Sequence, residues 1–558
     1  MIPSRRRSWI VLVVLLAAIA FAIGGQRMPD VVPATAPATE VSGARAMALL
    51  ERIAVSPRPS GEPAHRQAMD MIATELEASG FTVERQRGVL GMPLTNLTVP
   101  IAGSASTGTV LLLAHYDTVV RSPGAGDDGI GVVSWLETLR ALSAAGWRPR
   151  NDVLLLLTDG EECGMLGALH FARTDRRVAK VKTVVNLEAI GNGGPAFLFE
   201  LGPRNGARVR LFADAVERPA GSSFAEAVYH QLPNDTDFSI FLKRGTQGFN
   251  LALTRGSCAY HAPHDTPANI DPRSVQHMAD CAVALARRLG DVDLDALRAA
   301  DVTFFDCLGF VLVVYPRTWD PWFAALSGAL AIAALVRTRT RWLGLLNELL
   351  RHVVGVTLCA AIVVGLAWLG GLGLDLVAPW RGHVAGNTTS AALLFAGIMA
   401  LAIAGTLPRA NVDAAQLERR AAVAALSWSL AGGAACIWLP GTAFAVAMPG
   451  LAAGLGLLPG KRWRESWCAV LAPFAIGLTI VLPIVHLLVQ LMAPEPLVAI
   501  GIAAAVGASF ARLMSLPLAA VAHRPMPRRV LVVTAMVALV AALGVARGLG
   551  WRCGALWP

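Results

Sequence analysis

Charged residues are scarce in this chain: they make up 16% of its 558 residues, whereas hydrophobic residues make up 54%. This composition excludes an intrinsically disordered chain and argues against a water-soluble enzyme along the whole length. Acidic residues and lysine are scarcest late in the chain, where only seven acidic residues and one lysine occur from Arg317 onwards. Long apolar runs recur in that same part. We therefore predict a water-soluble domain joined to a membrane bundle.

Several common functional motifs are also absent. The eight cysteines form no Cys-x-x-Cys pair and no zinc-finger spacing, and the sequence cannot tell whether any of them pair in a disulfide. The chain has no Gly-x-Ser-x-Gly elbow, no His-Glu-x-x-His helix and no P-loop. No basic patch with interleaved aromatic residues accompanies the net charge of +9, so we expect no nucleic-acid partner.

The N-terminus resembles an export signal. Residues 1–25 combine Arg5, Arg6 and Arg7 with the apolar run Trp9–Ile23, so they form either a signal peptide or an uncleaved anchor. We favour the anchor because a membrane bundle follows. The Pro-, Ala- and Thr-rich residues 26–41 are predicted to be a linker.

The region 321–558 is predicted to be a transmembrane bundle of about eight helices. The expected spans lie near 321–336, 353–374, 390–407, 421–439, 442–458, 468–492, 497–515 and 530–546. Just before them, residues 301–320 are apolar but short and contain Asp306, so we expect an interfacial or packed connector there.

Arginine-rich loops alternate with charge-poor loops along this bundle, which predicts its orientation. If the N-terminus is cytoplasmic, all the arginine-rich loops are cytoplasmic, and the soluble domain lies outside. These loops are Arg337–Arg341, Arg419–Arg420, Lys461–Arg464 and Arg524–Arg529. The composition suits a bacterial inner membrane with a periplasmic domain, although a eukaryotic secretory membrane gives the same topology.

Between residues 42 and 300, helical and strand-like segments alternate. The expected helices are Ala46–Ile53, His65–Ser79 and Gly131–Leu142, and the expected strands are Thr109–Ala114, Asp152–Leu157, Thr183–Leu187, Ala196–Phe199 and Gly248–Leu253. This alternation predicts an α/β domain with a mostly parallel sheet and helices on both faces. Ligands bind such sheets beyond the C-terminal ends of the strands.

Acidic and imidazole side chains occupy those strand ends and two later loops. They are His115 and Asp117, Asp127 and Asp128, Glu161 and Glu162, Glu188, and His261 with His264. Charges do not normally end buried strands unless they are paired or bind a metal. This set of nitrogen and oxygen donors suits Zn²⁺, and one carboxylate can bridge two zinc ions in a hydrolytic centre. Of the adjacent Glu161 and Glu162, one can bind metal while the other handles the proton of the attacking water.

Five motifs, taken together and in order, resemble the co-catalytic zinc aminopeptidase family, which includes bacterial leucyl aminopeptidases, aminopeptidase Y and the glutaminyl cyclases. They are His115-Tyr-Asp117, Gly124-Ala-Gly-Asp127-Asp128, Glu161-Glu162, Asn186-Leu-Glu188 and Tyr260-His-Ala-Pro-His-Asp265-Thr266. The resemblance covers roughly residues 45–290 and implies two Zn²⁺ ions. It implies that Asp127 bridges them, with His115 and Glu188 at one ion and Glu162 and His261 at the other. It further implies Glu161 as the general base and Asp117 as the residue that holds the His115 ring.

Glu188 departs from many soluble members of this family, which have Asp at that position. The phrases Asn186-Leu-Glu-Ala189, Gly202-Pro203 and Asp235–Phe238 instead resemble the membrane-bound branch, the endoplasmic-reticulum and vacuolar-membrane metallopeptidases. That branch also has a multi-span C-terminal region. The resemblance thus implies a membrane-anchored zinc aminopeptidase that hydrolyses peptides on the extracytoplasmic side.

Two other functions stay open at this point: glutaminyl cyclase-like acyl transfer, and a peptide-binding transporter or scaffold whose outer domain is not catalytic. Substrate preference and oligomeric state are not predicted. Four residues near the motifs have simpler explanations than metal binding. Asp128 is expected in a turn or helix start, Asp237 as a helix cap or an orienting residue, Cys163 as a packed side chain, and His264 in loop hydrogen bonding.

Overall fold

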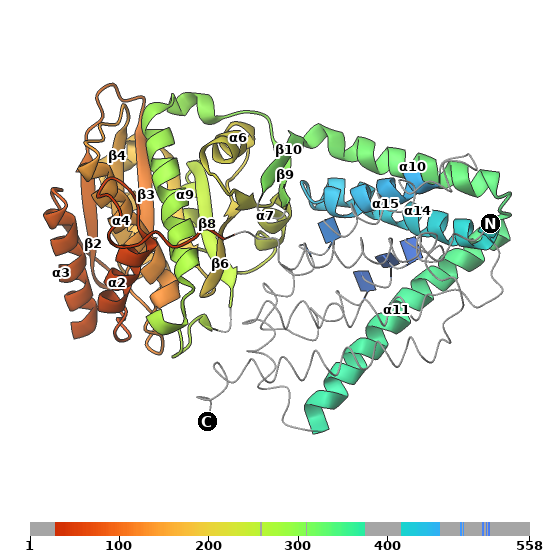
Figure 1. The fold of residues 1–558 in the computed structure, drawn as a ribbon, viewed down its shortest axis with the longest axis horizontal. Helices are drawn as coiled ribbons and strands as arrows, with labels where there is room; N and C mark the ends of the chain where they lie inside the picture. The colour runs from red at the N-terminus through yellow and green to blue at the C-terminus, as the bar shows by residue number, and fades with distance from the viewer. Residues whose placement is uncertain are drawn as a thin grey trace. The chain divides into compact units, whose positions relative to one another are not determined.

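The computed structural model describes residues 28–256, 259–307, 310–373, 414–457, 480–481, 484, 505–506, 509–510 and 512–513. The chain divides into two compact units (Figure 1). One unit is Arg27–Pro316, and the other combines Met1–Gln26 with Arg317–Pro558. The predicted N-terminal anchor, residues 1–25, lies outside the described residues.

The first unit is built on an eight-stranded sheet with the strand order β1-β2-β4-β3-β5-β8-β6-β7. The strands are β1 Glu84–Leu90, β2 Met92–Ile101, β3 Thr109–His115, β4 Asp152–Thr158, β5 Val181–Ala189, β6 Gly193–Glu200, β7 Ala220–Gly221 and β8 Gln247–Arg255. The four central strands β4, β3, β5 and β8 are mutually parallel. The pairings β1–β2, β2–β4 and β6–β8 are antiparallel, so the sheet is mixed. The predicted α/β fold with a parallel strand core is confirmed.

The central strands are apolar along their whole length because both faces of the sheet are covered. All seven residues of β3 are buried. Its side chains alternate between two cores: Val110 and Leu112 belong to the larger one, whereas Leu111 belongs to the smaller one. This alternation follows from the two-residue period of a strand.

Helices cover both of these cores. The larger core includes residues of α2 Gly43–Ile53, α3 Pro63–Ala78, α4 Gly131–Ala144, α6 Gly206–Ala215 and α9 Pro272–Asp291. The smaller core includes residues of α5 Leu166–Thr174 and α8 Asp237–Leu242. A further short helix, α7 Ser223–Tyr229, contacts β6. This arrangement leaves the C-terminal edge of the parallel strands available for the polar residues.

The segment predicted as a connector, residues 301–320, begins with an antiparallel hairpin of β9 Val302–Cys307 and β10 Val311–Pro316. The hairpin belongs to the first unit, where the Phe304 ring is buried in the larger core. A short 3₁₀ turn, η6 Arg317–Trp319, follows it and leads into the helices of the second unit.

The second unit contains the helices α10 Asp320–Arg337, α11 Trp342–Gly373, α14 Ala414–Trp438 and α15 Phe444–Gly456. Among the described residues, three stretches are long and apolar enough to cross a membrane: Arg317–Arg337, Trp342–Ala361 and Ala415–Trp438. They overlap the spans predicted at 321–336, 353–374 and 421–439, and α15 overlaps the span predicted at 442–458. The spans predicted at 390–407, 468–492, 497–515 and 530–546 lie wholly or largely outside the described residues.

Candidate metal centre

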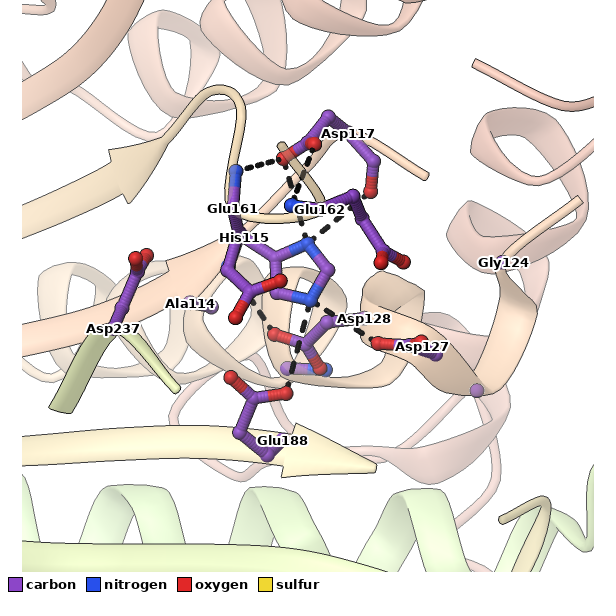
Figure 2. A network of polar contacts seen from close by, with 12 residues as sticks. Ala114, His115, Asp117, Gly124, Asp127, Asp128, Glu161, Glu162, Glu188 and Asp237 are labelled. Atoms are coloured by element: carbon purple, nitrogen blue, oxygen red, sulfur yellow. Dashed lines mark hydrogen bonds and ion pairs between the residues drawn. The ribbon is translucent and has the colours of Figure 1, made fainter. Parts of the chain in front are cut away.

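Three neighbouring parallel strands bring the predicted site residues to one edge of the sheet. His115 is the last residue of β3, Glu161 and Glu162 follow β4, and Glu188 is the penultimate residue of β5. Asp127 lies in the turn η1 Ala125–Ile130, which joins β3 to α4, and His261 lies in the loop after β8. Residues that are far apart in the chain therefore lie close together (Figure 2).

The Asp127 carboxylate lies at the centre of this group. Its Oδ1 is 3.1 Å from Nε2 of His115, and its Oδ2 is 3.1 Å from Nε2 of His261. Glu188 Oε2 lies 3.7 Å from His115 Nε2, and Glu162 Oε2 lies 3.0 Å from His261 Nε2. One carboxylate thus offers an oxygen to each of two histidine–glutamate pairs.

Two groups of three ligand atoms are close enough to hold a metal ion. Asp127, Glu162 and His261 form one group, and His115, Asp128 and Glu188 form the other, with ligand atoms within 4.8 Å of one another in each. The second group contains Asp128, which the sequence predicts only as a turn or helix-start residue. Asp128 Oδ1 does accept the Gly131 N–H at the start of α4, at 2.9 Å. Asp127 and Asp128 therefore both lie within reach of His115.

Asp117 connects the ends of β3 and β4. Its buried carboxylate accepts the backbone N–H groups of Glu161 and Glu162, at 3.1 Å and 3.2 Å, and its Oδ1 lies 3.6 Å from Nδ1 of His115. The Nδ1 atom also lies 3.2 Å from the Asp117 carbonyl oxygen. Asp117 thus fixes the His115 ring from the side opposite Asp127, as a supporting carboxylate does in many metal sites.

Glu161 and Glu162 point to different sides of the His115 ring (Figure 2). Glu162 is directed towards Asp127 and His261, whereas Glu161 lies on the side of Glu188. Burial raises the pKa of the Glu161 carboxyl well above its ordinary value. The two adjacent glutamates can therefore serve different purposes.

The electrostatics of the cluster fit a divalent cation. Burial alone would lower the pKa of His261, but the nearby carboxylates of Asp127 and Glu162 raise it to about 10. Burial also opposes protonation of His115, yet its carboxylate neighbours raise the pKa of the ring well above its ordinary value. Glu162 Oε1 is buried and makes no hydrogen bond with any described residue. The carboxylates of the cluster therefore stabilise positive charge on their neighbours, and one buried carboxylate oxygen has no described partner. Together with the two imidazoles they form a donor set that suits Zn²⁺.

The turn that carries Asp127 is fixed by residues whose roles the sequence does not reveal. Asp265 accepts the backbone N–H groups of Gly126 and Asp127, at 2.7 Å and 3.2 Å. The fully buried Arg58 donates to the carbonyl oxygens of Tyr116, Pro123 and Gly124. Asp265 appears in the last motif and Arg58 in none. The sequence holds no signal for the role of Arg58, because its burial is seen only in the structure.

Gly124 begins this turn in the left-handed conformation, with φ of 63°. A Cβ there would lie 2.2 Å from Thr118 Cγ2 and 2.5 Å from the Asp127 carbonyl oxygen. Only glycine fits this position without moving the turn.

A second polar network lies behind Glu188. Asn186 Nδ2 donates to Glu188 Oε1 at 3.3 Å and to Asn250 Oδ1 at 3.0 Å, and Asn250 Nδ2 donates to Glu200 Oε2 at 3.0 Å. All four side chains are buried. The amides hold Glu188 in one orientation, a contribution that the sequence alone gave no reason to expect.

The remaining candidates lie at the margin of the site. Asp237 is the first residue of α8, where Thr236 provides the cap, and burial raises the pKa of the Asp237 carboxyl to about 7. Cys163 is exposed, so it is not the packed side chain predicted. His264 accepts a hydrogen bond from Asn269 only through its backbone oxygen, and its ring Nε2 bonds no described residue.

Residues 96–286 match the model of Peptidase family M28. The chain contains an M28 peptidase domain. This match includes every predicted site residue from His115 to His261.

Curated relatives that match this chain include an endoplasmic reticulum metallopeptidase and a vacuolar membrane protease. Over 232 residues the chain is 32% identical to "Endoplasmic reticulum metallopeptidase 1" of Mus musculus, a match that covers 40% of this chain and 26% of the mouse protein. Over 256 residues it is 29% identical to "Vacuolar membrane protease" of Saccharomyces cerevisiae, a match that covers 44% of this chain and 26% of the yeast protein. The chain thus matches about a quarter of the length of these two relatives. Their names and the three apolar helices support an integral membrane protein.

Solved structures similar to the M28 unit include an aminopeptidase from Aneurinibacillus sp. strain AM-1, with a TM-score of 0.37 and 13% identity. That match covers 45% of this chain and 95% of the aminopeptidase. A glutaminyl cyclase from Porphyromonas gingivalis gives a TM-score of 0.36 and 20% identity, covering 45% of this chain and 98% of the cyclase.

Proposed function

We propose that this chain is a membrane-anchored, zinc-dependent metallopeptidase, and that its M28 domain is an aminopeptidase with two zinc ions. The observation that carries the proposal is the Asp127 carboxylate, whose two oxygens each lie 3.1 Å from a different histidine. His115 and Glu188 would hold one ion, Glu162 and His261 the other, and Asp127 both. Asp128 is the alternative ligand on the side of His115.

When bound, the two ions would polarise the scissile carbonyl and make a water molecule acidic enough to lose a proton near neutral pH. Glu161 would take that proton; the support is that it lies beside the ligand cluster but in neither group of candidate metal ligands. It would then deliver the proton to the leaving amine. Asp117 would keep the His115 ring oriented throughout.

We place the peptidase domain on the extracytoplasmic side of the membrane, in a bacterial inner membrane facing the periplasm. The support is the predicted alternation of arginine-rich and charge-poor segments, because all the arginine-rich segments are cytoplasmic when the first unit lies outside. One of them, Arg419–Arg420, was predicted as a loop but lies near the start of α14. Peptides with a free N-terminus would be the substrates. Labelling of Cys163, which is exposed, by a membrane-impermeant thiol reagent in intact cells tests this orientation.

The activity test compares peptides with free and acetylated N-termini, incubated with the purified full-length protein and analysed by mass spectrometry. Glu161→Gln should lower kcat by about 10²–10⁴-fold, the usual contribution of a general base, while the bound zinc stays unchanged. Glu217→Gln is the matched control, because this glutamate is 82% exposed and belongs to neither metal group. Normal turnover in Glu161→Gln would contradict the mechanism.

The same experiment separates the other two functions. A glutaminyl cyclase would convert N-terminal glutamine without shortening the peptide and would carry about one zinc ion per chain. A non-catalytic scaffold would bind peptides and leave them intact. Release of single N-terminal residues, abolished by a chelator and restored by zinc, is the result that the proposal requires.

A further inference from the structure

The second unit contains a group of charged side chains that the peptidase function does not use. Arg351 on α11 and Arg420 on α14 lie beside Glu348 of α11, and Arg512 is near enough for the Glu348 charge to act on it. Arg351 Nη1 lies 2.9 Å from Glu348 Oε1, and Arg420 Nε lies 3.8 Å from Glu348 Oε2. We name these four residues the arginine cluster.

Arg512 approaches α11 at a position without a side chain. Its Nη2 atom lies 3.3 Å from where a Cβ on Gly355 would stand. The charges of Arg351, Arg420 and Glu348 all act on its guanidinium. Gly355 lies one turn beyond Arg351 on α11, so the three guanidinium groups gather on neighbouring turns of adjacent helices.

The charges of the arginine cluster do not balance. Three guanidinium groups share one carboxylate, which leaves an excess of two positive charges among the described residues of the cluster. Glu418, two residues before Arg420 on α14, lies 3.2 Å from Arg337.

Hydrogen-bond donors in the cluster are also unused. The Arg420 Nε group is buried and bonds no described acceptor, and within the described part of the chain Arg512 has no hydrogen bond or ion pair. Uncompensated charge between apolar helices is costly, so the described residues of the cluster favour an anionic partner.

We propose that the arginine cluster binds the phosphate group of an anionic membrane lipid. Arg351 lies just before the span predicted at 353–374 and Arg420 just before that predicted at 421–439, although α11 and α14 begin earlier, at Trp342 and Ala414. Both positions are at the predicted cytoplasmic ends of these spans. Lipid phosphates are the anions present at that depth, and basic pockets between membrane helices bind such headgroups. The Arg351 side chain is 50% exposed and can reach a headgroup, whereas that of Arg420, at 20%, lies deeper.

Native mass spectrometry of the full chain in detergent, titrated with phosphatidylglycerol or phosphatidylcholine, tests this proposal. The protein should bind phosphatidylglycerol more tightly than phosphatidylcholine. Arg351→Gln and Arg420→Gln should each weaken phosphatidylglycerol binding about fivefold, because each arginine near an anionic lipid contributes about 1 kcal/mol. Using two variants keeps the test informative if one of them does not fold.

Arg419→Gln is the matched control, because it removes the same charge from the adjacent position of α14 and has no contact with Glu348. It should change phosphatidylglycerol binding less than twofold. An equal loss in Arg419→Gln, or no loss in the two cluster variants, would show that only the general surface charge matters and would overturn the proposal. Displacement of phosphatidylglycerol by an equal concentration of inorganic phosphate would also overturn it, because the site would then take a free anion.

Discussion

His277 of α9 provides a quantitative test of the first unit that does not depend on any metal. Its Nδ1 accepts the Ala196 N–H at 3.0 Å, and its Nε2 lies 2.9 Å from the Arg218 carbonyl oxygen. This arrangement suits the neutral ring with a proton on Nε2 only. Burial, assisted by the Arg218 charge, lowers the pKa of His277 from 6.5 to about 4.

The sign of the pH effect follows from this shift. Between the two pKa values the unfolded chain binds a proton that the folded chain does not, so stability falls as the pH falls from about 6.5 towards 4. One pKa unit corresponds to about 1.4 kcal/mol, which predicts a loss of about 2 kcal/mol between pH 7 and pH 5, and about 3 kcal/mol by pH 4. The contribution of His277 is fully present above pH 6.5.

Hydrogen-exchange mass spectrometry of α9 in the full-length protein measures this effect, after correction for the intrinsic pH dependence of exchange. His277→Gln is the comparison, since an amide can accept from Ala196 and donate to the Arg218 carbonyl but does not titrate. The free energy of opening in the wild type should fall by about 2 kcal/mol more than in His277→Gln from pH 7 to pH 5. Parallel pH profiles for the two proteins would refute the reasoning.

Three further predictions concern the metal centre. Asp265→Asn should weaken zinc binding about 10–100-fold in a chelator competition, because the amide cannot accept both N–H groups of the turn that carries Asp127. Unchanged zinc affinity would mean that the turn holds its shape without the carboxylate. Gly124→Ala should destabilise the first unit by more than about 1 kcal/mol in thermal unfolding, because the new methyl group would overlap Thr118. An unaltered melting temperature would contradict the close approach of the turn to that side chain. Removal of zinc by a chelator should lower the melting temperature at neutral pH, since a ligand at a hundred times its Kd stabilises the folded state by about 2.7 kcal/mol. A melting temperature that does not respond to the chelator would argue against a bound metal.

The parallel strands were predictable because their sequence is simple. Runs such as Leu111–Ala114 and Val153–Leu157 are continuously apolar, as strands buried on both faces must be, and each is followed by acidic or histidine residues. Strand β1 was not predicted because it lies at the edge of the sheet and its sequence, Glu-Arg-Gln-Arg-Gly-Val-Leu, is mostly exposed and polar.

The residues that support the site were not predictable, because their contacts are with distant backbone groups. Arg58 bonds carbonyl oxygens that lie 58 to 66 residues later, and Asp265 bonds N–H groups that lie 138 and 139 residues earlier. No periodicity or local spacing encodes such contacts. Side-chain chemistry at strand ends is visible in a sequence, whereas the choice between Asp127 and Asp128 at His115 depends on the geometry of the turn.

One physical rule underlies both proposals: excess charge of one sign inside a protein needs a partner of the other sign. In the M28 domain, Asp127, Glu162 and Glu188 meet at one edge of the sheet, and the fully buried Arg58 gives its hydrogen bonds to carbonyl oxygens rather than to them. In the arginine cluster the excess among the described residues is positive, and the proposed partner is an anion. The negative charge of the metal centre and the positive charge of the arginine cluster lie in separate units. A chelator therefore tests metal binding by the first unit, and lipid composition tests lipid binding by the second. Each proposal can therefore fail without affecting the other.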